Sequence, residues 1–217
     1  AQGRGTPVVV GGPDVTSSPD LYAAADFRVL GEAEGVMDNF VAAYLSGQPR
    51  GTFESPKFQV DVTRSPIPRF DLLNFDHYAQ VGVQFSRGCP FTCEFCDIIE
   101  LYGRKPRAKT NAQMLAELDR LYQLGYRGHV DFVDDNLIGN KRAVKTFLPA
   151  MREWQEGKGF PFEFSTEASL NLADDPELLA MMKAAAFFAV FIGIESPDAA
   201  VLIAAGKKQN TRRVIAD

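Results

Sequence analysis

Cysteine, long apolar runs and positive charge are all scarce in this sequence, and each shortage excludes a class of protein. No apolar run approaches the roughly 20 residues that a membrane-spanning helix needs. A net charge of −5 argues against a broad nucleic-acid surface, because such surfaces normally carry a basic face. The 46% hydrophobic and 24% charged composition of the 217 residues is that of a globular chain with one or two domains.

The few cysteines also bear on the compartment. All three lie close together, and no signal peptide is visible, which points to a reducing environment. We therefore expect a cytoplasmic protein. The chain begins with Ala1 rather than Met, and it enters almost at once an apolar strand at 7–10 that needs neighbours on both sides. We expect it to be a piece of a longer protein.

The cysteines form a C-x3-C-x2-C run at Cys89, Cys93 and Cys96, with the aromatic Phe95 directly before the last thiol. This is one thiol too few for a closed four-ligand site and one too many for a disulfide. Iron–sulfur clusters are usually held by four cysteines. Three ligands therefore predict a 4Fe-4S cluster with one iron left open for a substrate or cofactor.

A zinc knuckle is the alternative interpretation, in a binding module without catalysis. His77, Asp97 or His129 would then supply the fourth ligand. Structural zinc sites usually pair two short ligand arms, and only one arm is visible in this sequence. The pattern therefore favours the cluster.

The hydrophobic pattern predicts an α/β chain in two parts. Residues 1–47 contain strands at 8–10 and 27–30, each ending in a glycine turn and followed by helical periodicity. This design suits the C-terminal part of a Rossmann-like domain. Residues 48–78 are rich in proline and lack periodicity, as in a linker. Residues 79–217 alternate strands with helices, as a partial β/α barrel does.

Four strands are expected in the second part, and the last of them should be buried on both faces because it is apolar throughout. The expected strands are residues 81–85, 130–133, 162–165 and 189–194. A capping box at Thr110 to Gln113 opens the first helix, which Gly125 closes. A second helix is expected at 141–156, and Asp175 with Pro176 begins a third.

Polar residues follow all four strands. They are the cysteine loop, then 134–136 (Asp-Asp-Asn), then Glu167, then Glu195 with Ser196. In β/α barrels, the active groups sit at the carboxyl ends of the strands. The sequence therefore predicts that the residues following these four strands form one site.

Six stretches resemble the radical S-adenosylmethionine (SAM) enzymes that carry an N-terminal cobalamin-binding domain, a group that includes hopanoid C-2 methylase. The stretches are residues 84–91, 93–98, 102–104, 134–136, 166–169 and 193–196. The resemblance implies that Cys89, Cys93 and Cys96 bind a 4Fe-4S cluster, that the open iron binds SAM, and that Phe95 packs near the adenine. It places the last strands of a cobalamin domain in residues 1–47 and a radical SAM barrel in residues 79–217.

The resemblance also implies a reaction: methyl transfer from methylcobalamin to an unactivated carbon of a small-molecule or lipid substrate. A reducing partner such as a flavodoxin or ferredoxin would supply electrons, and a lipid substrate would allow membrane association. Cyclisation or oxidation with the same cofactors, without methyl transfer, is the alternative activity.

SAM presents an ammonium, a sulfonium and two ribose hydroxyls, for which carboxylates are natural acceptors. We therefore assign Asp134, Asp135, Glu167 and Glu195, with the adjacent Ser196, to a SAM pocket. Helix N-capping is the alternative role for Asp134 and Asp135, since acidic residues favour helix starts. A divalent-metal pair is a further reading of these two carboxylates.

Overall fold

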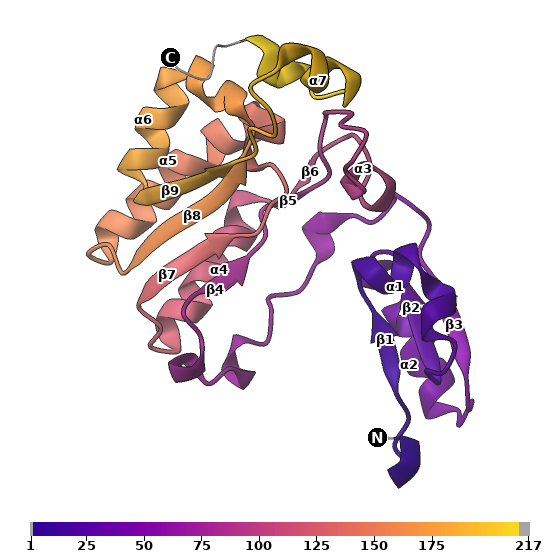
Figure 1. The fold of residues 1–217 in the computed structure, drawn as a ribbon. Coiled ribbons are helices and arrows are strands. Elements are labelled where there is room, and N and C mark those ends of the chain that lie inside the picture. Colours follow the sequence, from indigo (N-terminus) through magenta and orange to yellow (C-terminus); the bar gives the residue numbers. More distant parts are fainter. Residues whose placement is uncertain (1, 213–217) are drawn as a thin grey trace. The chain divides into compact units, whose positions relative to one another are not determined.

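The computed structural model describes residues 2–212, which form two compact units (Figure 1). The first unit runs through Ser65 and includes Glu100–Gly103. The second consists of Pro66–Ile99 and the chain from Arg104 onward. Both sheets that form the cores of these units are parallel. The predicted α/β class is confirmed.

The first unit is a three-stranded parallel sheet in the order β1-β2-β3, with two helices. Its elements are β1 (Val9–Gly11), α1 (Pro13–Ser17), β2 (Phe27–Leu30), α2 (Met37–Leu45) and β3 (Gly51–Glu54). Phe27 on the central strand is 1% exposed and packs edge-on against Phe40 of α2. This contact joins the helix to the sheet.

β3 lies inside the range 48–78 that the sequence predicts to be a linker, and the first unit continues to Ser65. The strand has four residues, and its exposure alternates from half-buried to exposed. Prolines at 49 and 56 flank it. Four residues give too short an alternation to stand out between prolines, so the pattern missed it. Three-residue 3-10 turns occupy much of the remaining range: Val62–Arg64, Phe70–Leu72 and Phe75–His77.

The second unit contains a parallel sheet in the order β4-β7-β8-β9 and a two-stranded antiparallel ribbon, β5 with β6. Its strands are β4 (Val81–Val83), β5 (Ser86–Arg87), β6 (Arg107–Ala108), β7 (Gly128–Phe132), β8 (Phe162–Ala168) and β9 (Phe187–Ile192). The helices from this part of the chain are α3 (Ile98–Leu101), α4 (Asn111–Gln123), α5 (Lys141–Gly157), α6 (Pro176–Ala184) and α7 (Ala199–Ala204).

Helices α4, α5 and α6 pack along one face of this sheet (Figure 1). Met114 and Leu118 of α4 are fully buried, and Phe147 of α5 stacks on Phe85 with ring centroids 5.0 Å apart. The predicted capping box at the start of α4 is present, with the Thr110 side chain accepting from the Gln113 backbone. These local signals placed the helices correctly because each depends on residues three or four apart.

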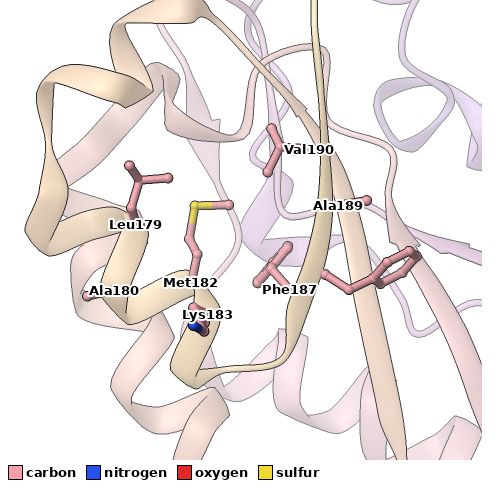
Figure 2. Close-up of a pocket in the computed structure, with 8 residues that line it drawn as sticks. Leu179, Ala180, Met182, Lys183, Phe187, Ala189 and Val190 are labelled. Carbon is pink, nitrogen blue, oxygen red and sulfur yellow. The ribbon is translucent and has the colours of Figure 1, made fainter.

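The expectation that the last strand is buried on both faces is wrong. β9 is an edge strand of the described sheet, and Phe188 and Phe191 are 59% and 69% exposed. Its other neighbour is α6, and the two enclose an open apolar groove of about 500 Å³ (Figure 2). Met182 and Val190 lie on its two sides. An apolar run indicates that burying the strand would be favourable. It does not show which faces of the strand other elements cover.

No helix within residues 2–212 is both long enough and apolar enough to cross a membrane.

A buried ion pair joins α4 to the end of the ribbon. Lys109 Nζ lies 2.6 Å from Glu117 Oε1, and the two side chains are 7% and 1% exposed. The Lys109 backbone N–H donates to Phe85 O at 2.9 Å. Burial raises the pKa of Glu117, and Lys109 offsets only part of that shift. Both charges have lost water, so each depends on the other.

We expect Lys109→Met to lower the free energy of unfolding by about 3–5 kcal/mol, because Glu117 would remain buried without its cation. Lys109→Met combined with Glu117→Leu removes both charges and should recover most of that loss. Urea unfolding of the metal-free chain measures both. As a control, Arg152→Met breaks the exposed pair of Arg152 with Glu156 and should cost less than about 1 kcal/mol. Equal losses in the single and double variants would contradict the pairing argument.

Candidate functional site

The cysteine loop begins at a backbone clamp formed by Asp134. Its Oδ2 accepts from the backbone N–H of Phe85 at 2.8 Å. Its Oδ1 accepts from the backbone N–H and the hydroxyl of Ser86 at 2.5 and 2.6 Å. Asp134 is 1% exposed. Both oxygens are therefore engaged by the protein itself, and Asp134, which the sequence assigned to a cofactor pocket, holds the base of the loop.

Burial raises the pKa of Asp134 to about 6, and the charge of Asp135 adds to the shift. The hydrogen bonds from Ser86 and Phe85 act in the opposite direction. The carboxylate takes this place because the β4–β7 ladder ends near Val83, so the next N–H groups along the chain need another acceptor.

The three cysteine side chains are free thiols, and each is partly exposed. Burial is the main cause of the raised pKa values of Cys89 and Cys96. Cys89 and Cys93 also raise the pKa of Cys96 through electrostatic repulsion, so the sulfurs lie within electrostatic range of one another. The loop thus brings three thiols together. Their thiolate forms would need a nearby cation to offset the negative charge.

Every one of these sulfurs receives an N–H donor. The donors are the backbone of Phe91 and Asn136 Nδ2 for Cys89, Gln209 Nε2 for Cys93, and the backbone of Ile98 for Cys96. The two amide contacts measure 3.7 Å from Asn136 and 3.5 Å from Gln209. Donors aimed at sulfur stabilise the thiolate form, which is the form that binds metal.

The arrangement bears on which metal group the thiols fit. Within residues 2–212, no group of three or more His, Cys, Asp or Glu side chains is arranged to hold a single metal ion. Of the three candidate fourth zinc ligands, His129 Nε2 lies 2.6 Å from Ser165 Oγ, His77 Nε2 lies 3.4 Å from Asn74 Nδ2, and Asp97 is exposed. The described residues therefore give no support to a preformed site for a single ion.

A second segment, from the end of α7, packs on the cysteine loop. Glu94 donates its backbone N–H to Ala205 O at 2.9 Å. Gly206 has φ +71°, and a Cβ there would lie 2.6 Å from Thr92 O. Only glycine fits at this approach. No sequence signal indicated the roles of Gly206 and Gln209. A glycine after a helix indicates that the helix ends, but it does not indicate which segment packs against it.

Glu195 is joined to the cysteine loop through Lys207. Lys207 Nζ lies 2.5 Å from Glu195 Oε1 and 5.6 Å from the centre of the Phe95 ring. The lysine side chain is 10% exposed, whereas that of Glu195 is 41% exposed. Asn210 supports the β9 exit by donating to Gly193 O and Ile194 O. The contacts bring two predicted features together: Glu195 at the end of the fourth strand and Phe95, the aromatic residue of the loop.

The carboxylates of Asp135 and Glu167 have no ion-pair partner among the residues that the structure describes. Asp135 Oδ2 is buried and has no hydrogen-bond partner in the described part of the chain. Burial raises the pKa of Asp135, with further contributions from the charges of Glu167 and Asp97. Burial also raises the pKa of Glu167. β8 is longer than predicted, so Glu167 lies within the strand instead of after it. The mutual repulsion of these carboxylates would be relieved by a cation.

Ser196 stabilises the turn in which it lies. Its hydroxyl accepts from the backbone N–H of Asp198 at 3.0 Å, and Asp198 in turn caps α7. Ser196 therefore shapes the entry into α7.

The comparison with protein families now decides the class of this chain. The sequence pattern of the Radical SAM superfamily matches residues 83–216. The chain belongs to the Radical SAM superfamily.

Two curated relatives of this superfamily member are methyltransferases by name. An uncharacterised methyltransferase of Synechocystis sp. is 53% identical over 219 residues, which cover 100% of this chain and 41% of the relative. The hopanoid C-2 methylase of Rhodopseudomonas palustris is 42% identical over 207 residues, covering 94% of this chain and 39% of the methylase. The chain thus spans about two fifths of the length of these relatives.

Solved structures share the fold of this radical SAM chain. The methyltransferase TsrM from Kitasatospora setae, with cobalamin and a [4Fe-4S] cluster bound, matches with a TM-score of 0.75 at 18% identity. The match covers 97% of this chain and 47% of TsrM. The cobalamin-dependent radical enzyme OxsB matches with a TM-score of 0.68 at 19% identity, over 93% of this chain and 33% of OxsB.

The raised pKa of Asp134 predicts a pH dependence of stability. A carboxyl whose pKa is higher in the folded chain contributes stability below its ordinary pKa, and loses it as the pH rises through the folded value, here about 6. Asp134→Asn cannot titrate. We expect the unfolding free energy of the wild type minus that of Asp134→Asn to fall by up to roughly 3 kcal/mol between about pH 4 and pH 6.

Chemical denaturation of the metal-free chain measures this difference. Asp175→Asn is the matched control, because Lys145 lowers the pKa of Asp175. Its difference from the wild type should fall toward acid pH instead. A difference for Asp134→Asn that stays flat with pH would show that burial does not govern its protonation.

Proposed function

We propose that this chain is the central part of a cobalamin-dependent radical SAM methyltransferase acting on an unactivated carbon. The observation that carries the proposal is the set of three free thiols, each with an N–H donor, on a loop leaving the carboxyl end of a parallel sheet. Uncommitted carboxylates accompany them. Membership of the superfamily and the methyltransferase relatives support the reaction class.

Cys89, Cys93 and Cys96 would hold a 4Fe-4S cluster, with one iron free of protein ligands. A cluster held there would supply the electron for reductive cleavage of SAM. The chain's own contribution is to hold the thiols on a loop anchored at Phe85 and Ser86 and to place N–H donors on the sulfurs.

The carboxylates would position SAM. Asp135 offers a buried oxygen that has no partner within residues 2–212, which suits an ammonium donor, and Glu167 adds a second negative charge within electrostatic range. Phe95 is 59% exposed and offers a ring face to the adenine. Glu195 shares its charge with Lys207, so it suits a neutral donor such as a ribose hydroxyl.

The first unit would contribute to cobalamin binding. Its parallel strands β1 and β2 end in Gly11-Gly12 and Gly31, and the chain turns there with positive φ at Gly12 and Gly31. Ligands of open parallel sheets bind outside the carboxyl ends of the strands. The fold similarity to TsrM, whose structure holds cobalamin, supports this role. The 42% identity to a hopanoid methylase favours an apolar, lipid-like substrate.

The cluster proposal predicts metal content. Anaerobic reconstitution of the wild-type chain should give about four iron and four sulfide per chain. Cys89→Ala, Cys93→Ala and Cys96→Ala should each abolish reductive cleavage of SAM, measured as 5′-deoxyadenosine, while circular dichroism of the metal-free chain stays unchanged. One zinc and no iron would refute the proposal in favour of the binding module.

Methyl transfer needs a second measurement on the full-length protein with cobalamin and a candidate hopanoid substrate. Label from the methyl group of SAM should enter the product. Production of 5′-deoxyadenosine and altered substrate without label would refute methyl transfer and leave cyclisation or oxidation.

The SAM pocket predicts a graded effect at Glu195. Glu195→Gln keeps an acceptor oxygen, whereas Glu195→Ala loses the contact and leaves the buried amine of Lys207 unpaired. We expect Ala to weaken SAM binding by about 1–3 kcal/mol and Gln by less, measured by calorimetry on the reconstituted chain with iron content unchanged. Glu153→Ala, on the exposed face of α5, serves as the control. Unaltered affinity for Glu195→Ala would remove Glu195 from the pocket.

A further inference from the structure

The side-chain amide of Asn136 lies buried between β8 and the cysteine loop, and only 3% of the residue is exposed. Its Oδ1 accepts from the backbone N–H of Ser169 at 3.3 Å. A backbone N–H can only donate, so the oxygen of the amide must face Ser169. The NH₂ group then faces Cys89 Sγ, at 3.7 Å. Ser169 thus fixes which end of the amide meets the sulfur.

The surroundings of Cys89 disfavour negative charge on its sulfur. The loop buries the thiol, and the carboxylate of Asp135 is within electrostatic range. Two N–H donors oppose these effects, the backbone of Phe91 and the amide of Asn136. A donor that faces a sulfur gains strength as negative charge on the sulfur increases. The contact from Asn136 therefore responds to the charge that the sulfur carries.

We propose that Asn136 is a positioning residue that donates to the Cys89 sulfur and raises the reduction potential of the cluster. The inference rests on the proposed function, since it takes Cys89 as a cluster ligand. Hydrogen bonds to sulfur are among the factors that set the potential of iron–sulfur clusters. The reduced cluster carries one more negative charge, shared with its sulfurs, so a donor stabilises the reduced form more than the oxidised form.

Burial makes the amide donor of Asn136 harder for water to replace than that of Gln209. Gln209 donates to Cys93 from a segment where its side chain is partly exposed, so water can take over a lost hydrogen bond. At Asn136, water has no such access. Removing the Asn136 amide should therefore shift the potential more than Gln209→Leu does.

The test is a redox titration of the reconstituted chain at one fixed pH, followed by electron paramagnetic resonance. Asn136→Asp keeps the shape and the oxygen that faces Ser169 but replaces the donor with an acceptor. Asn136→Leu removes the donor without adding charge. Both variants should titrate at a more negative potential than the wild type, and Asn136→Asp should shift further because it adds a negative charge.

Asn171→Asp is the matched control. It adds the same charge to the same network, since the Ser169 hydroxyl donates to Asn171 Oδ1 at 2.5 Å, and it should shift the potential less than Asn136→Asp. Iron and sulfide content and circular dichroism accompany each titration. Asn136→Leu at the wild-type potential with full iron would overturn the proposal, as would an equal shift in Asn171→Asp.

Loss of iron from both Asn136 variants in folded chains would also overturn the tuning role and make Asn136 a structural residue. Failure of the proposed function itself gives a different result, because the wild-type chain would then take up no iron.

Discussion

The site depends on the way a long loop is closed at its base. After Phe85 the chain leaves the sheet, and it returns at Lys109, whose N–H donates to Phe85 O. The antiparallel pairing of Ser86 with Ala108 and the carboxylate of Asp134 hold the same point. Closing a loop costs entropy that grows with its length. Since these contacts offset that cost at the base, the thiols can occupy defined positions without a core of their own beneath them.

Three consecutive residues after β7, at 134–136, each have a different role in the site. Asp134 turns inward and binds the backbone at the loop base. Asp135 keeps a buried oxygen without a partner in the described chain, and its charge reaches Cys89. Asn136 links Ser169 to the sulfur of Cys89. One short segment at a strand end thus supports the loop, supplies charge and orients a donor.

The far end of the described chain completes the site. Residues after α7 bind the cysteine loop through backbone contacts at Ala205 and Gly206, and Lys207 bridges Glu195 and the Phe95 ring. The bridging amine compensates the negative charge of Glu195 at this edge of the sheet. Loop and last strand are therefore held by residues more than a hundred positions beyond the cysteines, as the contact of Gln209 with Cys93 illustrates.

The sequence by itself determined the four strands of the larger sheet in the second unit, the helices α4, α5 and α6, and the three thiols, because periodicity, capping at Thr110 and cysteine spacing are local signals. It missed the short strands β3, β5 and β6 and the short helices α3 and α7. Only the tertiary structure decided that β9 is an exposed edge, that Asp134 binds backbone and that Gln209 meets a sulfur. A residue's type states what it can bind, whereas its partner is set by which distant segments the fold brings within reach.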